Sequence, residues 1–369
     1  MLHILNENSE RLVVRKRNKL PGLNLDHLVR LTDDTGILQH SIFTVPNRAE
    51  GYSIDDNARA LILAVRLERE VNELPATSRL ALAYRYLAFL EHALNRENGR
   101  FRNFLSYDRR WLEDEGSEDS HGRAMWALGT VLGQSRNFGL RGAAERLFSL
   151  ALPAAAEFHS PRASAYVLLG LQEYLLARPR DTNARKLQTQ IALRLADMFR
   201  ASTDPDWSWF EDVASYANAR LPQALMLAGK SCGNERILSA GVEALDWLME
   251  AQIPAETGLF APIGSNGFYQ RSGTKARFDQ QPIEAAGAVS ACLEAYRATG
   301  DERWRNDAWS AFLWFLGDND LHLPLYDADT GGCRDGLHPD RPNQNQGAES
   351  TLSFLTALLE MHYLDNLWI

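Results

Sequence analysis

The chain has 369 residues, 45% of them hydrophobic, and a formal net charge of −9 with a pI near 5.6. This length and composition provide a large core, and an acidic chain without a basic stripe disfavours nucleic acid or an anionic membrane as a partner. Three widely separated cysteines, Cys232, Cys292 and Cys333, lack CxxC spacing. They argue against a disulfide framework or a zinc cage and suit a reducing compartment.

The N-terminal segment MLHILNENSERLVVRKRNKL has neither a secretory apolar core nor a small-residue cleavage site. No stretch approaches the roughly 18 uninterrupted apolar residues of a membrane span. We therefore expect a soluble, cytoplasmic protein. Residues 1–20 are predicted to form an exposed arm, followed by a single domain over residues 21–369.

A long-period repeat runs through the chain: six polar clusters each lead into a helix rich in small residues. The six starts are SIDDNARALILAV from Ser53, EDSHGRAMWALG from Glu118, SPRASAYVLLGL from Ser160, SYANARLPQALMLAG from Ser215, DQQPIEAAGAVSACL from Asp279 and NQGAESTLSFLTALL from Asn345. Between successive starts lies a second helical stretch, richer in charge and bulky aliphatic residues. Such a repeat predicts helix pairs that close into a ring, with the polar clusters on one face.

Apolar residues that recur at intervals of three and four, among many Ala, Leu, Arg and Glu, predict twelve helices in alternation. The small-residue helices, expected inside, span about 55–70, 120–133, 161–177, 217–230, 281–299 and 346–364. The helices with one polar face, expected outside, span about 23–33, 76–95, 139–156, 183–201, 235–251 and 302–316. The predicted class is all-α.

The connections differ in length. Those from inner to outer helices are short, whereas those from outer to inner helices are long, except the one near Ser160. Four long connections share a motif in which an acidic residue is followed two positions later by a glycine, and the glycine two positions later by an apolar residue. A fifth connection carries an imperfect copy of this motif. These motifs begin at Asp34, Glu97, Glu256, Asp329 and Asp204. Each predicts a tight turn with positive φ, and hence a small hairpin flap at the mouth of the ring.

Six inner and six outer helices in alternation resemble the (α/α)6 toroid of the six-hairpin glycosidase-like proteins, over about Leu23 to Leu364. That superfamily includes inverting glycoside hydrolases, unsaturated-uronyl hydrolases and sugar 2-epimerases. The strings GYSIDDNARAL, EDSHGRA and NQGAESTLSFL also resemble a bacterial domain that occurs alone or behind glycosyltransferases. The resemblance implies a carbohydrate-active protein, with an oligosaccharide as its partner.

Carboxylates cluster at the predicted inner-helix starts, where an inverting glycosidase would need one acid and one base. We expect these roles among Asp56, Asp119, Glu284 and Glu349, without ordering acid and base. Helix capping is the alternative function for the aspartates, and a capping box is the alternative for Glu284, which follows Pro282 in the first turn.

Other polar and aromatic residues near the same starts are expected to bind sugar hydroxyl groups or to stack on sugar rings. They are Tyr52, Asp55, Asn57, His121, Arg123, Trp209, Asp212, Tyr216, Asn218, Arg220, Gln280, Gln281, Asp335, Asn345 and Gln346. A plug that seals the barrel is the alternative function for Trp209. Arg123, Arg162 and Arg220 occupy matching places in three helices, where they either pair with acids or bind an acidic sugar or phosphate.

Two further functions remain open. The first is a sugar 2-epimerase or isomerase that uses His121, although no second histidine repeats its placement. The second is a non-catalytic glycan-binding module that serves a glycosyltransferase. Neither a nucleotide-binding motif nor a cluster with metal-ligand spacing is present, so no cofactor or metal is expected. The sugar, the linkage and the oligomeric state are not predicted.

Overall fold

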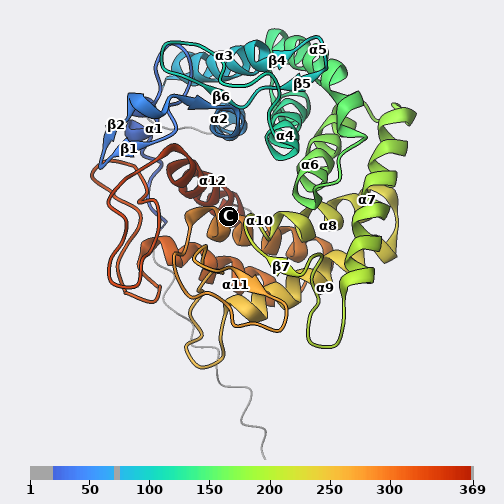
Figure 1. The fold of residues 1–369 in the computed structure, drawn as a ribbon, viewed down its shortest axis with the longest axis vertical. Coiled ribbons are helices and arrows are strands. Elements are labelled where there is room, and N and C mark those ends of the chain that lie inside the picture. The colour runs from blue at the N-terminus through green and yellow to red at the C-terminus, as the bar shows by residue number, and fades with distance from the viewer. Residues whose placement is uncertain (1–19, 70–74, 367–369) are drawn as a thin grey trace, which may run out of the picture.

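Alternating inner and outer helices form a closed ring in the computed structural model, which describes residues 20–69 and 75–366 (Figure 1). The inner helices are α2 (Ile54–Arg66), α4 (Glu118–Gln134), α6 (Pro161–Ala177), α8 (Arg220–Cys232), α10 (Pro282–Thr299) and α12 (Ala348–Asn366). The outer helices are α1 (Asp26–Leu31), α3 (Ala76–Ala93), α5 (Phe138–Ala155), α7 (Thr182–Ser202), α9 (Glu235–Gln252) and α11 (Glu302–Leu313). Each inner helix contacts the next, and α12 returns to α2.

This arrangement confirms the predicted all-α toroid of six helical hairpins within the described residues. The proposed N-terminal arm, which includes the basic run at 15–19, lies outside the described residues apart from Leu20. None of the described helices is both long enough and apolar enough to cross a bilayer.

Serine side chains begin three of the inner helices. Ser53, Ser117 and Ser160 each accept a hydrogen bond from the backbone N–H three residues later, as N-cap residues do. The acidic residues therefore lie within the first turns of α2 and α4, where the helix dipole favours negative charge. Because hairpins of antiparallel helices repeat around the ring, all six inner N-termini face the same side.

Glycines allow α4 and α6 to approach each other closely. A Cβ atom on Gly129 would lie 2.2 Å from the carbonyl oxygen of Gly170, and one on Gly170 would lie 2.5 Å from that of Met125. These distances are too short for any side chain, so the two backbones are in direct contact. The small residues of the repeat thus determine how tightly the inner ring closes.

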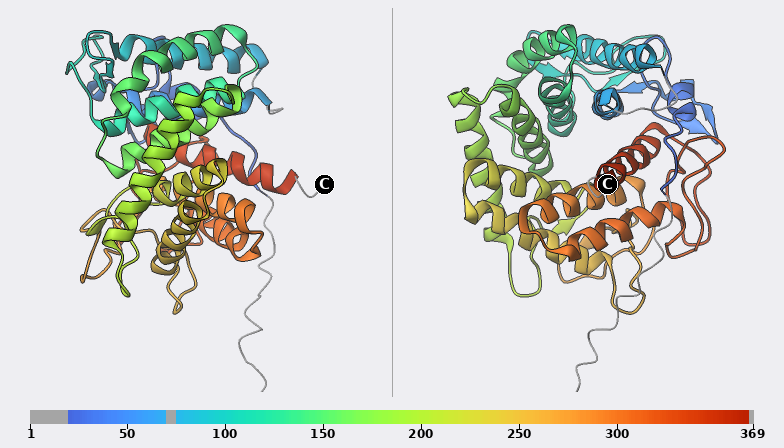
Figure 2. Two further views of the ribbon diagram at one scale, coloured as in Figure 1. Left: turned by 90° about the vertical axis from the view of Figure 1, so that its right-hand side faces the viewer. Right: turned by 180° about the vertical axis from the view of Figure 1, so that it is seen from behind.

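The strands are confined to two-residue ladders in the connections and form four antiparallel pairs in the described residues. They are β1 (Ser41–Ile42) with β2 (Val45–Pro46), β3 (Tyr52–Ser53) with β6 (Phe104–Leu105), β4 (Leu94–Asn95) with β5 (Arg100–Phe101), and β7 (Val213–Ala214) with β8 (Tyr269–Gln270). Short 3-10 helices are η1 (Arg48–Glu50), η2 (Leu67–Arg69) and η3 (Trp314–Leu316). The long connections lie on the face opposite the end of α12 (Figure 2, left).

The predicted turns are confirmed at Gly99, Gly258 and Gly331, which all have positive φ. Gly36 differs, because its φ is not in that region. A glycine is required at position 36 because a Cβ atom there would lie 2.3 Å from Oδ1 of Asn57. That oxygen accepts a hydrogen bond from the N–H of Ile37 at 3.0 Å.

Replacing Gly129 by alanine should destabilise the protein by about 1–3 kcal/mol, because the added methyl group pushes α4 away from α6. Gly142, on the outer helix α5, has open space around its Cβ position. The matched variant Gly142→Ala should leave the free energy of unfolding unchanged or raise it by up to about 1 kcal/mol through helix propensity. Urea denaturation measures both, and equal effects would contradict direct contact between these backbones.

Candidate functional site

A narrow cavity lies inside the ring and receives side chains from all six inner helices. Its lining is Arg59, Ile62, Arg123, Trp126, Tyr166, Arg220, Ile283, Ala286, Leu352, Ser353 and Thr356. Its volume of about 30 Å³ is room for roughly two water-sized groups. A larger depression of about 510 Å³ lies against the outer helix α3, and none of the predicted site residues lines it.

Arg59 joins two predicted catalytic carboxylates at the entrance of this cavity. Its guanidinium donates to Oδ1 of Asp56 at 2.8 Å and to Oε2 of Glu349 at 2.6 Å. Asp56 is buried and accepts a second hydrogen bond from the Ser53 hydroxyl at 2.6 Å. Burial raises the pKa of Asp56 and the Arg59 charge opposes this rise. The Glu349 side chain is 42% exposed and therefore reachable from the mouth.

Arg123 is the second buried arginine of this group. Its Nε lies 3.5 Å from Oδ1 of Asp55, and neither atom has a hydrogen-bond partner. The guanidinium covers the ring of Tyr166 at 4.3 Å from the ring centre, as in a cation–π contact. Asp55, Glu349 and Asp119 all act electrostatically on Arg123. Carboxylates of α2, α4 and α12 thus interact electrostatically with one cation, and Asp55 of α2 lies in direct ion-pair distance.

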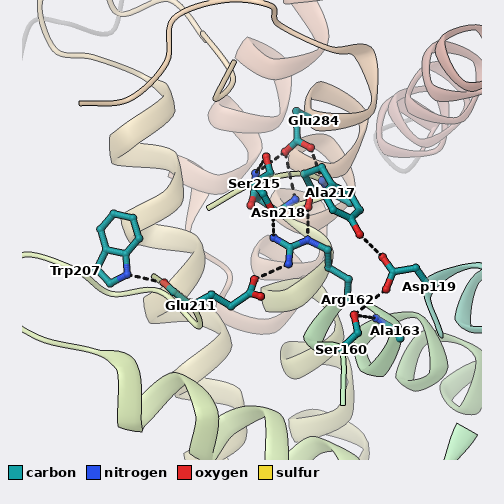
Figure 3. A network of polar contacts seen from close by, with 11 residues as sticks. Asp119, Ser160, Arg162, Ala163, Trp207, Glu211, Ser215, Ala217, Asn218 and Glu284 are labelled. Atoms are coloured by element: carbon teal, nitrogen blue, oxygen red, sulfur yellow. Dashed lines mark hydrogen bonds and ion pairs between the residues drawn. The ribbon is translucent and has the colours of Figure 1, made fainter. Parts of the chain in front are cut away.

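Asp119 is held by two hydroxyl groups from other parts of the ring. Ser160 donates to Oδ1 at 2.7 Å and Tyr216 donates to Oδ2 at 2.6 Å (Figure 3). The side chain of Tyr216 is half-exposed, so this contact lies at the mouth. The predicted residues Asp119 and Tyr216 are therefore direct neighbours.

Glu284 has a different environment from the other predicted catalytic residues. Its carboxylate accepts from the N–H of Ala217 and from the N–H and side-chain amide of Asn218, the latter two at 3.2 and 3.0 Å (Figure 3). Ala217 has φ of +48°, so α8 begins at Arg220 instead of the predicted residue 217. Glu284 caps this irregular start from the neighbouring helix. A capping-box function within α10 is wrong, because the N–H groups that it binds belong to α8.

The three arginines at matching places differ in their partners. Arg162 is fully engaged: it donates to Glu211 at 2.5 Å, to the Ser215 hydroxyl at 2.7 Å and to the carbonyl of Tyr216 at 2.6 Å (Figure 3). Arg220 donates to the side chain of Gln223 at 2.7 Å, and no carboxylate of the described residues forms an ion pair with it. The expected pairing with an acid is therefore found for Arg162, whose partner is Glu211 instead of Asp56, Asp119 or Glu284, and is not found for Arg220.

Several predicted substrate-binding residues are buried in the protein and do not line the cavity. Trp209 has no exposed surface and stacks on Trp247, so it has a structural function in the core and the expected stacking on a sugar is wrong. The other buried members bind protein groups: Tyr52 to Asp33, Asn57 to Ile37, Asn218 to Glu284, Gln280 to Asp320 and Trp314, and Gln346 to Asp327. Their hydrogen-bonding groups stabilise loops, which corrects their expected contact with substrate.

The remaining predicted residues lie around the mouth. Asp212 is 84% exposed and pairs with Arg271 at 3.0 Å. Asn345 accepts from the N–H of Phe43 at 2.9 Å, and the half-buried Gln281 lies 3.5 Å from the Ser265 hydroxyl. Asp335 accepts from the N–H of Gly347 at 2.7 Å, just before α12, and burial raises its pKa.

Sequence reasoning missed Arg59, Trp126, Tyr166 and Ser353 in the cavity lining. A signal was present, because Arg59, Arg123, Tyr166 and Ser353 are each the sixth residue of their helices, which begin at Ile54, Glu118, Pro161 and Ala348. The same place in four repeats faces the ring axis. In the described residues, no three His, Cys, Asp or Glu side chains gather in a way that would hold a metal ion.

His121 is enclosed between the rings of Phe101 and Phe158, and its Nε2 lies 3.1 Å from the carbonyl of Ala151. It has no exposed surface, so the prediction that it contacts a substrate is wrong. Burial and, to a smaller extent, the charge of Arg100 lower the pKa of His121 to about 3.

The folded protein therefore favours the neutral His121 ring, whereas the unfolded chain binds a proton below pH 6.5. This contribution to stability is present above pH 6.5 and is lost as the pH falls toward 3. Between pH 6 and 4 the wild type should lose up to about 1.4 kcal/mol per pH unit more than His121→Gln. Urea denaturation at several pH values measures the difference. His159→Gln, at an exposed position, should keep the wild-type slope; an unchanged slope in His121→Gln would contradict the assignment.

No protein-family model matches this chain, and no curated protein matches its sequence. Solved structures do match its fold. Cellobiose 2-epimerase from Bacillus thermoamylovorans is 12% identical, with a TM-score of 0.71 over 93% of this chain and 96% of that chain. D-mannose isomerase is 12% identical, with a TM-score of 0.67 over 92% and 94%. The α-1,6-mannanase of Salegentibacter in complex with α-1,6-mannotetrose is 14% identical, with a TM-score of 0.61 over 92% and 96%. The shared fold is the (α/α)6 toroid.

Proposed function

We propose that this protein is a carbohydrate-active enzyme that hydrolyses an oligosaccharide at the mouth of its central cavity. The observation that carries the proposal is the gathering of Asp55, Asp119 and Glu349 from three inner helices around the buried Arg123. Hydrolysis with inversion needs one carboxyl group to protonate the leaving oxygen and another to activate water, at a separation of roughly 6.5–9.5 Å.

Asp119 and Glu349 are the favoured catalytic pair. Both are half-exposed at the mouth, and each is oriented by protein donors: Asp119 by Ser160 and Tyr216, and Glu349 by Arg59. Asp56 instead positions Arg59, since its carboxylate is buried and accepts from the Arg59 guanidinium at 2.8 Å. Glu284 supports the start of α8 and takes no part in the reaction.

The fold likeness to glycosidases adds support. One of the matching structures is an inactive variant of the Salegentibacter mannanase in which two consecutive aspartates are replaced. This chain has consecutive aspartates, Asp55 and Asp56, in the first turn of α2 at the cavity mouth. The two proteins share the residue type and the consecutive placement of these carboxylates, although their sequences are only 14% identical.

A sugar 2-epimerase or isomerase is the second candidate, favoured by the TM-scores of 0.71 and 0.67 to enzymes of those kinds. Moving a proton at the carbon beside the carbonyl needs an accessible base, and His121 is buried. No histidine is among the residues that line the cavity. Such an enzyme would incorporate deuterium from heavy water into the sugar without releasing new reducing ends.

A panel of oligosaccharides, read by released reducing sugar, tests the proposal. On any substrate found, Asp119→Asn and Glu349→Gln should each lower kcat/KM by roughly 10²–10⁴-fold, the contribution of a general acid or base. Asp340→Asn changes an exposed carboxylate bound to Arg341 and should keep full activity.

Full activity in either of the two cavity-mouth variants would overturn the assignment of that residue. Deuterium incorporation without cleavage would replace hydrolysis by epimerisation. Sugar binding that survives both substitutions, with no turnover by the wild type, would identify a glycan-binding module.

A further inference from the structure

The charged side chains that line the cavity beneath the acidic mouth are all cations. Three arginines, Arg59, Arg123 and Arg220, contribute to the lining, and no carboxylate does. This is unexpected in a chain with a net charge of −9. The carboxylates lie in the first turns of the helices, and the arginines Arg59 and Arg123 lie one turn deeper.

Arg220 carries the argument, because its charge is buried without a counter-ion. The residue is 7% exposed, and its one hydrogen bond in the described part of the chain goes to the amide oxygen of Gln223. Its guanidinium covers the ring of Trp126 at 5.0 Å from the ring centre. Glu360, an acid that acts on Arg220, is already paired with Arg66 at 2.7 Å. Arginine does not lose its proton in proteins, so the positive charge persists.

Arg162 shows what a structural arginine in this ring looks like. It is also buried, but Glu211 neutralises it and two further acceptors complete its hydrogen bonds. Burying a charge without such a partner is unfavourable. Arg220 faces the cavity without the carboxylate partner that Arg162 has.

We propose that this cavity binds the oxyanion of an acidic sugar, a carboxylate or a phosphate, with Arg220 and Arg123 as its cationic partners. The inference deepens the proposed function and rests on it only for the sugar part of the ligand. The cavity volume of about 30 Å³ has room for the two oxygens of a carboxylate or for part of a phosphate group, and is too small for a sugar ring. The ring itself would lie above, at Asp119 and Glu349.

Further groups in the cavity suit an anion. The Tyr166 hydroxyl is buried without a hydrogen-bond partner and faces the same lining as both arginines. Ser353 and Thr356 add two hydroxyl groups from one side of α12. A guanidinium and several O–H donors are the groups that bind carboxylates and phosphates in proteins.

Binding to matched sugars tests the inference on the full-length protein. Methyl glucuronide and methyl glucoside differ only in a carboxylate, and glucose 6-phosphate and glucose differ only in a phosphate. Calorimetric titration should show at least tenfold tighter binding for one charged member than for its neutral counterpart. The pair that shows the difference identifies the source of the oxyanion. Inorganic phosphate, with sodium chloride at equal ionic strength as control, provides a probe without sugar.

Arg220→Met removes the charge and keeps an unbranched, flexible apolar side chain. This variant should lose the preference for the charged sugar by at least tenfold while its melting temperature stays equal or rises, because no counter-ion is left behind. Arg162→Met is the matched control: it should lower the melting temperature, because Glu211 loses its partner. A merely structural Arg220 would behave like Arg162.

The outcomes separate this inference from the proposed function. Equal affinity for charged and neutral sugars, or unchanged preference in Arg220→Met, overturns the oxyanion site even if neutral oligosaccharides are cleaved. Loss of stability in Arg220→Met, to the extent seen in Arg162→Met, also overturns it. Charged-sugar binding that depends on Arg220, without any turnover, upholds the site and rejects hydrolysis.

Discussion

Direct contact between the backbones of adjacent inner helices is the constraint on which the rest of this structure depends. Gly129 and Gly170 allow α4 and α6 to touch, and no larger residue would fit at either position. Because these helices lie so close together, the space they surround is narrow. Side chains from all six inner helices meet in that space, and their chemistry is concentrated in a small volume.

Local patterns were enough to predict the ring. The apolar period, the small-residue segments and the alternation of loop lengths all depend on neighbours in sequence, and each of the twelve predicted helices is present in the described residues. Three of the four glycine turns were also predictable from an acid two positions before the glycine. Gly36 was not, because its requirement comes from Asn57, twenty residues away.

The candidate site was predictable only in part, because its residues depend on contacts across the ring. Glu284 was expected to act on substrate, but its carboxylate binds the backbone at the start of another helix. Trp209 follows a charged loop in sequence and yet stacks in the interior against Trp247. Arg59 was overlooked, although it is the sixth residue of its helix, as Arg123 is. The sequence of a single helix does not show which of its faces points toward the axis of the ring, so this shared position was not recognised as part of the cavity lining.

The polar groups of the ring form two electrostatic layers. Asp55, Asp119 and Glu349 lie at the helix starts, where backbone N–H groups favour negative charge. The guanidinium groups of Arg59 and Arg123 lie one turn below, and that of Arg123 covers the ring of Tyr166. These two arginines interact favourably with the carboxylates above them. Such a gradient would orient a polar ligand by its charge.

The ring closes where its first and last inner helices, α2 and α12, meet, and the interactions at this junction differ from those between other inner helices. Arg59 pairs with Glu349, and Arg66 pairs with Glu360, so two ion pairs link α2 to α12. The α4–α6 junction depends instead on backbone contact between glycines. Coulombic attraction weakens when either partner is protonated or drawn to another charge, whereas steric fit does not. A ligand that binds Glu349 therefore competes with Arg59 for the same carboxylate. Binding at the mouth is thus coupled to the strength of the α2–α12 contact that closes the ring.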